Sequence, residues 1–189
     1  MQALNTALQP MPKGGIVEIK EKNNLIISGK GIVTVTKRGT RKYADDGKLL
    51  DPGEIVAVVE NHNIICNEGL QLLAAYAIDE SATYDTGLTY CEAGTGQTTP
   101  AAADTTLTTY ANRLAVTSKS RNNYEVTIST FFTAAQLTYH IYEAGIWGGG
   151  DAAAGPATGL LFSHFLVNYN NSAGLYDVTI TYVLSVARG

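Results

Sequence analysis

Alternation of apolar and polar residues runs through most of this chain and predicts strands along most of its length. Clear runs of period two are GIVTVTK at 31–37 and YEVTISTFF at 124–132. Turn-forming residues separate the apolar runs, as Asn122–Asn123 do before the second of them. The other predicted strands show the same apolar character between turn signals: 16–19, 25–27, 54–66 with a bend at 61–63, 88–92, 112–118, 138–147, 160–169 and 175–187.

One segment has helical periodicity instead. Leu70, Leu73, Ala74 and Ala77 recur at helical spacing and predict an amphipathic helix over 67–78. Asn67 is the expected N-cap, and Glu68 suits the positive end of the helix. A single helix among many strands predicts a mainly β fold, an antiparallel β-sandwich or jelly roll in which the helix covers one end or face.

The predicted organisation is one domain with an extended arm. The chain has 189 residues, of which 45% are hydrophobic and 16% charged, so it can bury a core and shows little sign of disorder. Pro10, Pro12 and two glycines stop any helix near the start, which predicts an extended arm over 1–15. Residues 16–59 are expected to form a basic β-hairpin region, and 60–189 a β-sandwich body.

The net charge of −4 conceals an asymmetry along the chain. Residues 1–50 hold nine bases and four acids, which gives 9 − 4 = +5, and the remainder carries −9. A basic segment on an acidic body suits docking to an acidic protein shell. A solvated basic hairpin without a partner is the alternative. The basic candidates for such an interface are Lys13, Lys20, Lys22, Lys37, Arg38, Arg41 and Lys42.

Few residues suggest chemistry. Cys66 and Cys91 lie outside any CxxC motif, and reduced, buried thiols are expected. The three histidines form no metal-binding or catalytic motif, so we expect no metal, no cofactor and no enzymatic activity. No aromatic stacking platform accompanies the basic residues, so a nucleic-acid partner is not expected. No apolar run could cross a bilayer, and the start lacks the features of a signal peptide.

A long loop after the strand at 88–92 is the most distinctive stretch of the sequence. Gly94, Gly96 and Pro100 exclude a regular element, and no helix or Lys-Ser/Thr pair follows that would complete a phosphate-binding loop. Asp104 is expected to organise this loop through bonds to its backbone. Glu143 is expected to be buried and paired with backbone groups or an arginine, and Arg113 is the first candidate.

Trp147 precedes three glycines. It is interpreted either as a core residue or as an aromatic anchor at a subunit contact, because tryptophan is enriched at interfaces. The sequence alone leaves both alternatives open.

From about residue 60 to the C-terminus, the order of several short motifs resembles a pattern in accessory virion proteins of tailed bacteriophages. The pattern runs from N-x-x-x-N-x-G-L through G-T-G-x-x-x-P-x-x-x-D-T-x-L and an arginine to E-A-G-I/L-[FW] and L-F. The matching residues are Asn63, Asn67, Gly69, Leu70, Gly94, Thr95, Gly96, Pro100, Asp104, Thr105, Leu107, Arg113, Glu143, Ala144, Gly145, Ile146, Trp147, Leu161 and Phe162.

This resemblance implies a non-enzymatic virion protein, made and assembled in the bacterial host cytoplasm. The compact chain and its basic segment favour decoration or cementing of the capsid, with the major capsid protein as partner. A tail, collar, baseplate or fibre-attachment protein with tail or neck partners is the alternative. A homotrimer is expected, since accessory virion proteins bind at symmetric positions. From another class, the eleven tyrosines suggest a carbohydrate-binding adhesin module for a host surface glycan.

Overall fold

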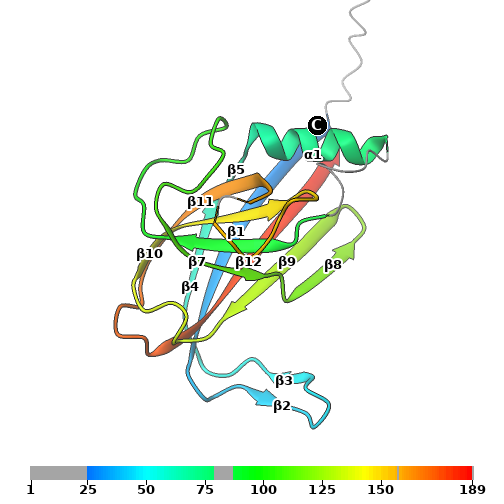
Figure 1. Cartoon of the computed structure of the whole chain (residues 1–189). Helices are drawn as coiled ribbons and strands as arrows, with labels where there is room; N and C mark the ends of the chain where they lie inside the picture. The colour runs from blue at the N-terminus through cyan, green and yellow to red at the C-terminus, as the bar shows by residue number, and fades with distance from the viewer. Residues whose placement is uncertain (1–24, 79–86, 157, 189) are drawn as a thin grey trace, which may run out of the picture.

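The computed structural model describes residues 25–78, 87–156 and 158–188, and the chain is mainly antiparallel β structure with one short helix (Figure 1). The predicted fold class is therefore confirmed in these terms. Two five-stranded sheets enclose the core, which is compatible with a β-sandwich, while the jelly-roll detail stays a prediction. The predicted arm over 1–15, the strand over 16–19, and Lys13, Lys20 and Lys22 lie outside the described residues.

The first sheet has the strand order β4–β1–β12–β9–β8. Strand β1 pairs along its whole length with β12, from Leu25 opposite Arg188 to Lys37 opposite Tyr176, and its other edge pairs with β4. The sequence predicts two short strands, over 25–27 and 31–37, within a separate basic β-hairpin region over 16–59. The structure instead has one continuous strand, β1, inside the first sheet. The strands are β1 (Leu25–Lys37), β4 (Ile55–His62), β8 (Ser118–Asn122), β9 (Glu125–Phe132) and β12 (Tyr176–Arg188).

The second sheet has the order β5–β11–β10–β6–β7. The chain passes from the first sheet to the second at Asn63, between β4 and β5, which is where the sequence predicts a bend. The long strand expected over 54–66 is thereby divided between the two sheets. The strands of the second sheet are β5 (Ile64–Ile65), β6 (Tyr90–Gly94), β7 (Tyr110–Ala115), β10 (His140–Gly148) and β11 (Leu160–Asn170).

Alternate residues of both sheets meet in one apolar core, as a period of two requires. Phe162 of β11 and Tyr182 of β12 meet edge to face, with ring centroids 5.8 Å apart. Gly31 lies in the middle of β1, where a Cβ atom would collide with the ring of Phe165. The glycine therefore lets the two sheets approach closely at this point. The largest buried aliphatic members of the core are Leu72, Leu137, Ile141, Ile146 and Ile180.

Helix α1 (Asn67–Ala77) lies across one end of the two sheets (Figure 1). The structure corrects two details of its prediction. Cys66 occupies the N-cap position without a side-chain hydrogen bond, so Asn67 is not the cap. The buried side of the helix holds Gly69, Leu72 and Ala75, whereas Leu70 is exposed. The reason is a tertiary contact: Gly69 packs against the backbone of Phe162, where a Cβ would not fit.

A small hairpin, β2 (Lys42–Tyr43) and β3 (Leu49–Asp51), projects from the end of the molecule opposite α1 (Figure 1). The sequence predicts its turns at Gly47 and Gly53, and both glycines have positive φ, 83° and 84°. Arg41 anchors its base. The guanidinium Nη2 donates to Thr179 Oγ1 at 2.8 Å and lies 4.0 Å above the centre of the Phe131 ring.

Candidate functional site

The outer face of the second sheet carries a buried layer of charged residues. Cys91, Ala93, Ala144 and Ile146 point into the core between the sheets. Their neighbours along β6 and β10 therefore point to the opposite face. Residues directly opposite in an antiparallel pair share a face, so the register brings these side chains together. The polar and charged members of this layer are Glu92, Arg113, Glu143 and His164.

Glu143 is the anchor of the long loop between β6 and β7. Its Oε1 accepts hydrogen bonds from the backbone N–H of Gly96, at 3.0 Å, and of Thr109, at 2.8 Å. Its Oε2 accepts from the N–H of Thr108 at 3.0 Å. Both ends of the loop are thus tied to one fully buried carboxylate. The predicted bonding of Glu143 to backbone groups is confirmed.

His164 completes this anchor, and the sequence did not predict it. Its Nε2 lies 3.0 Å from Oε2 of Glu143, and its Nδ1 lies 2.8 Å from Oδ2 of Asp104. The same Asp104 oxygen accepts from the backbone N–H of Ala101 at 2.8 Å, so the predicted role of Asp104 in its own loop is confirmed. The imidazole bridges a buried and a partly exposed carboxylate. We refer to Asp104, His164 and Glu143 as the loop anchor.

The loop anchor favours charged forms of its members. Burial alone would lower the pKa of His164, but its hydrogen bonds to Glu143 and Asp104 outweigh burial and raise that pKa. Burial alone would raise the pKa of Glu143, but hydrogen bonds from His164, Thr109 and Thr108 outweigh it and lower that pKa. Both shifts therefore favour the charged forms, a protonated imidazole beside an ionised Glu143 carboxylate.

Arg113 does not pair with Glu143, which corrects the predicted partner. It lies opposite Glu92 in the β6–β7 register, and its Nη1 is 3.4 Å from Oε2 of Glu92. The guanidinium also donates to the carbonyls of Gly155, at 3.1 Å, and Thr158, at 2.7 Å. Arg113 thereby fastens the segment between β10 and β11 onto the sheet, while the loop anchor fastens the one between β6 and β7.

Trp147 belongs to this buried layer. It is 1% exposed, packs with Cys66 and Leu161, and lies under the guanidinium of Arg113, which is 4.6 Å from the ring centroid. The structure thus places Trp147 in the core, and it is not an exposed anchor. Cys66 and Cys91 are free and buried, as predicted. Burial raises the pKa of each thiol to about 12.

Two of the four basic interface candidates that the structure describes, Lys37 and Lys42, are paired with acids of the same chain. Lys37 Nζ lies 3.2 Å from Oε2 of Glu54, and Lys42 Nζ lies 3.8 Å from Oδ2 of Asp51. Lys30 is similarly paired with Glu60, at 2.8 Å. Residues 25–62 hold six bases and five acids, a balance of 6 − 5 = +1. Arg38 is exposed and Arg41 is half-buried at the hairpin base. The positive charge counted over residues 1–50 is therefore largely offset by acids that follow it.

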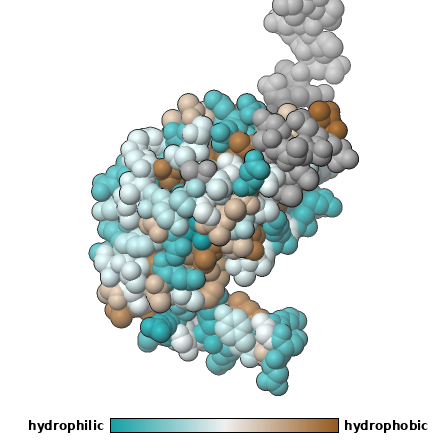
Figure 2. All heavy atoms as spheres, viewed as in Figure 1, coloured by the Kyte–Doolittle hydropathy of each residue, from teal (hydrophilic) through white to brown (hydrophobic). Residues whose placement is uncertain are grey.

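Exposed apolar side chains are also prominent on the β2–β3 hairpin. Tyr43, Leu49 and Leu50 of the hairpin are 51%, 43% and 65% exposed. Figure 2 shows the hairpin projecting from the body, with hydrophobic and hydrophilic residues mixed on its visible surface. Clustered apolar exposure on a projecting element is typical of a protein–protein contact.

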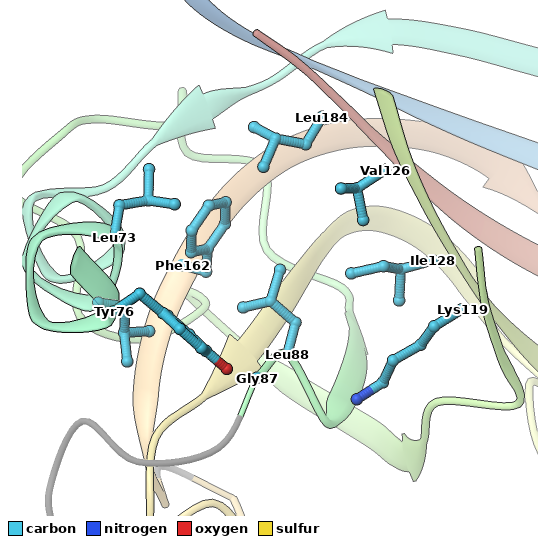
Figure 3. Close-up of a pocket in the computed structure, with 10 residues that line it drawn as sticks. Leu73, Tyr76, Gly87, Leu88, Lys119, Val126, Ile128, Phe162 and Leu184 are labelled. Carbon is cyan, nitrogen blue, oxygen red and sulfur yellow. The ribbon is translucent and has the colours of Figure 1, made fainter. Parts of the chain in front are cut away.

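An apolar pocket of about 280 Å³ lies between α1 and the first sheet (Figure 3). Leu73 and Tyr76 line it from the helix, and Val126, Ile128 and Leu184 line it from the sheet. Among the described residues that line it, Lys119 of β8 is the one that carries a charge. The pocket is separate from the loop anchor, and the figure shows the lysine ammonium at its border.

Among the described residues, no group of histidine, cysteine and acidic side chains is arranged to hold a metal ion. No helix in the described ranges is long and apolar enough to cross a membrane. Comparisons with protein-family models, with curated proteins and with solved structures find no match to this chain.

Proposed function

We propose that this chain is a non-enzymatic structural protein of a tailed-bacteriophage virion, which decorates or cements the capsid as a symmetric oligomer. The motif order from residue 60 onward supports the virion assignment. The projecting hairpin with exposed Tyr43, Leu49 and Leu50 is the observation that carries the assembly role. Arg41 anchors the base of the hairpin to the first sheet, so the exposed apolar residues at its tip are held in place.

The hydrogen bonds of the buried charged groups support a structural role over catalysis. The two oxygens of Glu143 together accept four hydrogen bonds, three from backbone N–H groups and one from His164. No acceptor site on this carboxylate is left for a substrate. The guanidinium of Arg113 is likewise engaged by two carbonyls and Glu92. These groups hold loops in place, which suits a rigid attachment protein.

Quantitative mass spectrometry of purified phage particles from the host that makes the protein tests this assignment. Hundreds of copies per particle are expected for capsid decoration. A handful of copies per particle would instead assign the protein to the tail, collar or baseplate. Absence of the chain from washed particles would overturn the virion assignment.

The hairpin contact is tested separately by binding the purified chain to particles that lack it. The variant Leu50→Ser removes the most exposed hairpin leucine and is expected to weaken binding. Leu175→Ser, at a 57% exposed leucine in the turn between β11 and β12, is the matched control and should bind normally. Because the charges of residues 25–62 nearly cancel, binding through this element should change little across a salt series. Equal binding by both variants would exclude the hairpin as the contact.

A further inference from the structure

A second pocket, of about 300 Å³, lies between the β2–β3 hairpin and the outer face of the first sheet. Leu49 and Pro52 line it from the hairpin segment, and Phe131 of β9 lines it from the sheet. Thr34 of β1 lies opposite Thr179 of β12, which lies opposite Phe131, so the pocket extends across three neighbouring strands. Because the hairpin projects from the end of the molecule opposite α1, this pocket is distinct from the apolar pocket beside the helix (Figure 1).

Hydroxyl groups make up most of the polar lining of this pocket. Those of Thr117 and Thr179 already accept hydrogen bonds from other groups of the protein. Those of Thr34 and Ser118 have no hydrogen-bond partner in the described part of the chain. A hydroxyl can both donate and accept, so these two are available to the hydroxyl groups of a ligand. The lining hydroxyls belong to Thr34, Thr36, Thr117, Ser118, Ser129 and Thr179.

The same pocket carries a positive charge that the protein does not balance. Among the described lining residues, Arg41 is the one that carries a charge, and within the described ranges it forms no ion pair. The acids at the base of the hairpin are paired with lysines instead. Oε2 of Glu54 lies 3.2 Å from Nζ of Lys37, and Oδ2 of Asp51 lies 3.8 Å from Nζ of Lys42. The pocket therefore favours an anionic ligand.

The guanidinium of Arg41 is held in place while part of its donor fork stays free. Its Nη2 donates to Thr179 Oγ1 at 2.8 Å, and its Cζ lies 4.0 Å from the centre of the Phe131 ring. Its Nε is buried without a partner. No described residue accepts a hydrogen bond from Nη1, so Nη1 and the second hydrogen of Nη2 can donate to the two oxygens of a carboxylate. Since the sheet already fixes the side chain, little of its freedom is lost when an anion binds.

We propose that this pocket binds a monosaccharide unit that bears a carboxylate, of the hexuronic acid class. The carboxylate binds the free part of the Arg41 fork, and the ring hydroxyls bind Thr34 and Ser118. Leu49 and Pro52 pack against the C–H groups of the ring. The volume lies at the lower end of the range for ligand pockets, so it suits one small ring.

An acidic saccharide is favoured because it matches all three kinds of group in the lining. A simple carboxylate would use the guanidinium and leave the free hydroxyls of Thr34 and Ser118 without partners. A neutral sugar would leave the charge of Arg41 unbalanced. The site does not rest on the virion assignment. Leu50, whose substitution tests the hairpin contact, does not line the pocket, so the two proposals can fail separately.

Titration of the full-length, ¹⁵N-labelled chain with D-glucuronate, followed by NMR, tests the proposal. The backbone amide signals of Thr34, Ser118 and Phe131 are expected to shift saturably, with a dissociation constant on the order of 1 mM. D-glucose lacks the carboxylate and acetate lacks the ring hydroxyls, so each should bind at least about tenfold more weakly. Absence of saturable shifts with glucuronate overturns the proposal. Equal affinity for glucose or for acetate also overturns it, because the charge or the hydroxyls would then contribute nothing.

Two glutamate variants place the site on the molecule. Thr34→Glu puts a carboxylate beside Thr179, the partner of Arg41, so it should occupy the guanidinium and abolish glucuronate binding while the hairpin stays anchored. Thr127→Glu makes the same change on the outer face of β9, outside the pocket, and should bind like the wild type. Arg41→Gln should also lose binding, but it removes the anchor of the hairpin as well, so Thr34→Glu is the decisive variant. Unchanged binding by Thr34→Glu, or equal loss in Thr127→Glu, overturns the site.

Discussion

His164 and Glu143, 21 residues apart in the sequence, meet through a 3.0 Å contact between imidazole Nε2 and carboxylate Oε2 on the outer face of the second sheet. The contact joins β11 to β10 and lies under the long loop between β6 and β7. Through Asp104, which contacts the other imidazole nitrogen, it continues to the loop itself. The position of the loop and the packing of the sheet therefore both depend on the charged groups of the loop anchor. Four predictions concern this buried layer.

The first prediction is that Glu143→Gln destabilises the fold by about 3 kcal/mol. The amide keeps the shape of the carboxylate, but its NH₂ group faces donors, and His164 loses its charged partner. Urea unfolding measures the change in free energy. Glu125→Gln, at an exposed carboxylate on β9, is the control and should stay within about 0.5 kcal/mol of wild type. A result for Glu143→Gln that matches this control contradicts the role of the loop anchor.

The second prediction concerns the pH dependence of stability. The folded pKa of His164 is raised above its ordinary 6.5, so its stabilising contribution is complete below that value and is lost as the pH rises through the folded pKa. The folded pKa of Glu143 is lowered below its ordinary 4.5, so its contribution is complete above that value and is lost as the pH falls through the folded pKa.

Chemical unfolding at a series of pH values separates the histidine effect. Burial raises the pKa of Glu92 to about 7, so that residue also lowers stability as the pH rises towards 7. The part of the decline above pH 6.5 that belongs to His164 should therefore disappear in His164→Gln, while the part that belongs to Glu92 should remain. His62→Gln, at an exposed histidine of β4, should keep the decline. The same slope in wild type and His164→Gln would show that His164 does not titrate in this range.

The third prediction is that Arg113→Met destabilises the fold by about 3–5 kcal/mol, because Glu92 is left buried without its partner and two carbonyls lose their donor. Replacing Glu92 by Gln in the same chain should recover part of the loss, and the double-mutant cycle gives the coupling. Arg121→Met, on exposed β8, serves as the control and should have little effect. A strictly additive double variant would mean that the 3.4 Å contact between Arg113 and Glu92 contributes nothing.

The fourth prediction is that Gly96→Ala costs about 1–3 kcal/mol. A Cβ at this position would collide with the Glu143 carboxylate and with Thr108, so the loop could not close on the anchor. Gly155→Ala is the matched control: its Cβ would meet only Thr158 Cγ2, at 3.9 Å. The control should be neutral or slightly stabilising, since alanine reduces the freedom of the unfolded chain. Thermal unfolding of the two variants compares them directly, and equal melting temperatures would contradict the prediction.

Local pattern predicted the elements of this protein well. Period-two alternation located β9, and apolar runs between turn signals located β10, β11 and β12, each to within a few residues. Asparagine or glycine marked their turns. The turn at Asn123 has φ of 51°, and that at Gly174 has φ of 60°. Period two reports which residues share a face of a sheet, and a turn needs particular backbone angles, so both can be recognised from neighbouring residues alone.

Tertiary contacts decided what local pattern could not. The rotation of α1 depends on Gly69 meeting the Phe162 backbone, and the continuity of β1 depends on β12, more than 100 residues away in the sequence. The partner of Glu143 was mispredicted for the same reason. An acid inside an apolar strand indicated a buried, bonded carboxylate, because a buried charge requires partners. Which partners it meets depends on register between strands, and the register places Arg113 opposite Glu92 while His164 reaches Glu143.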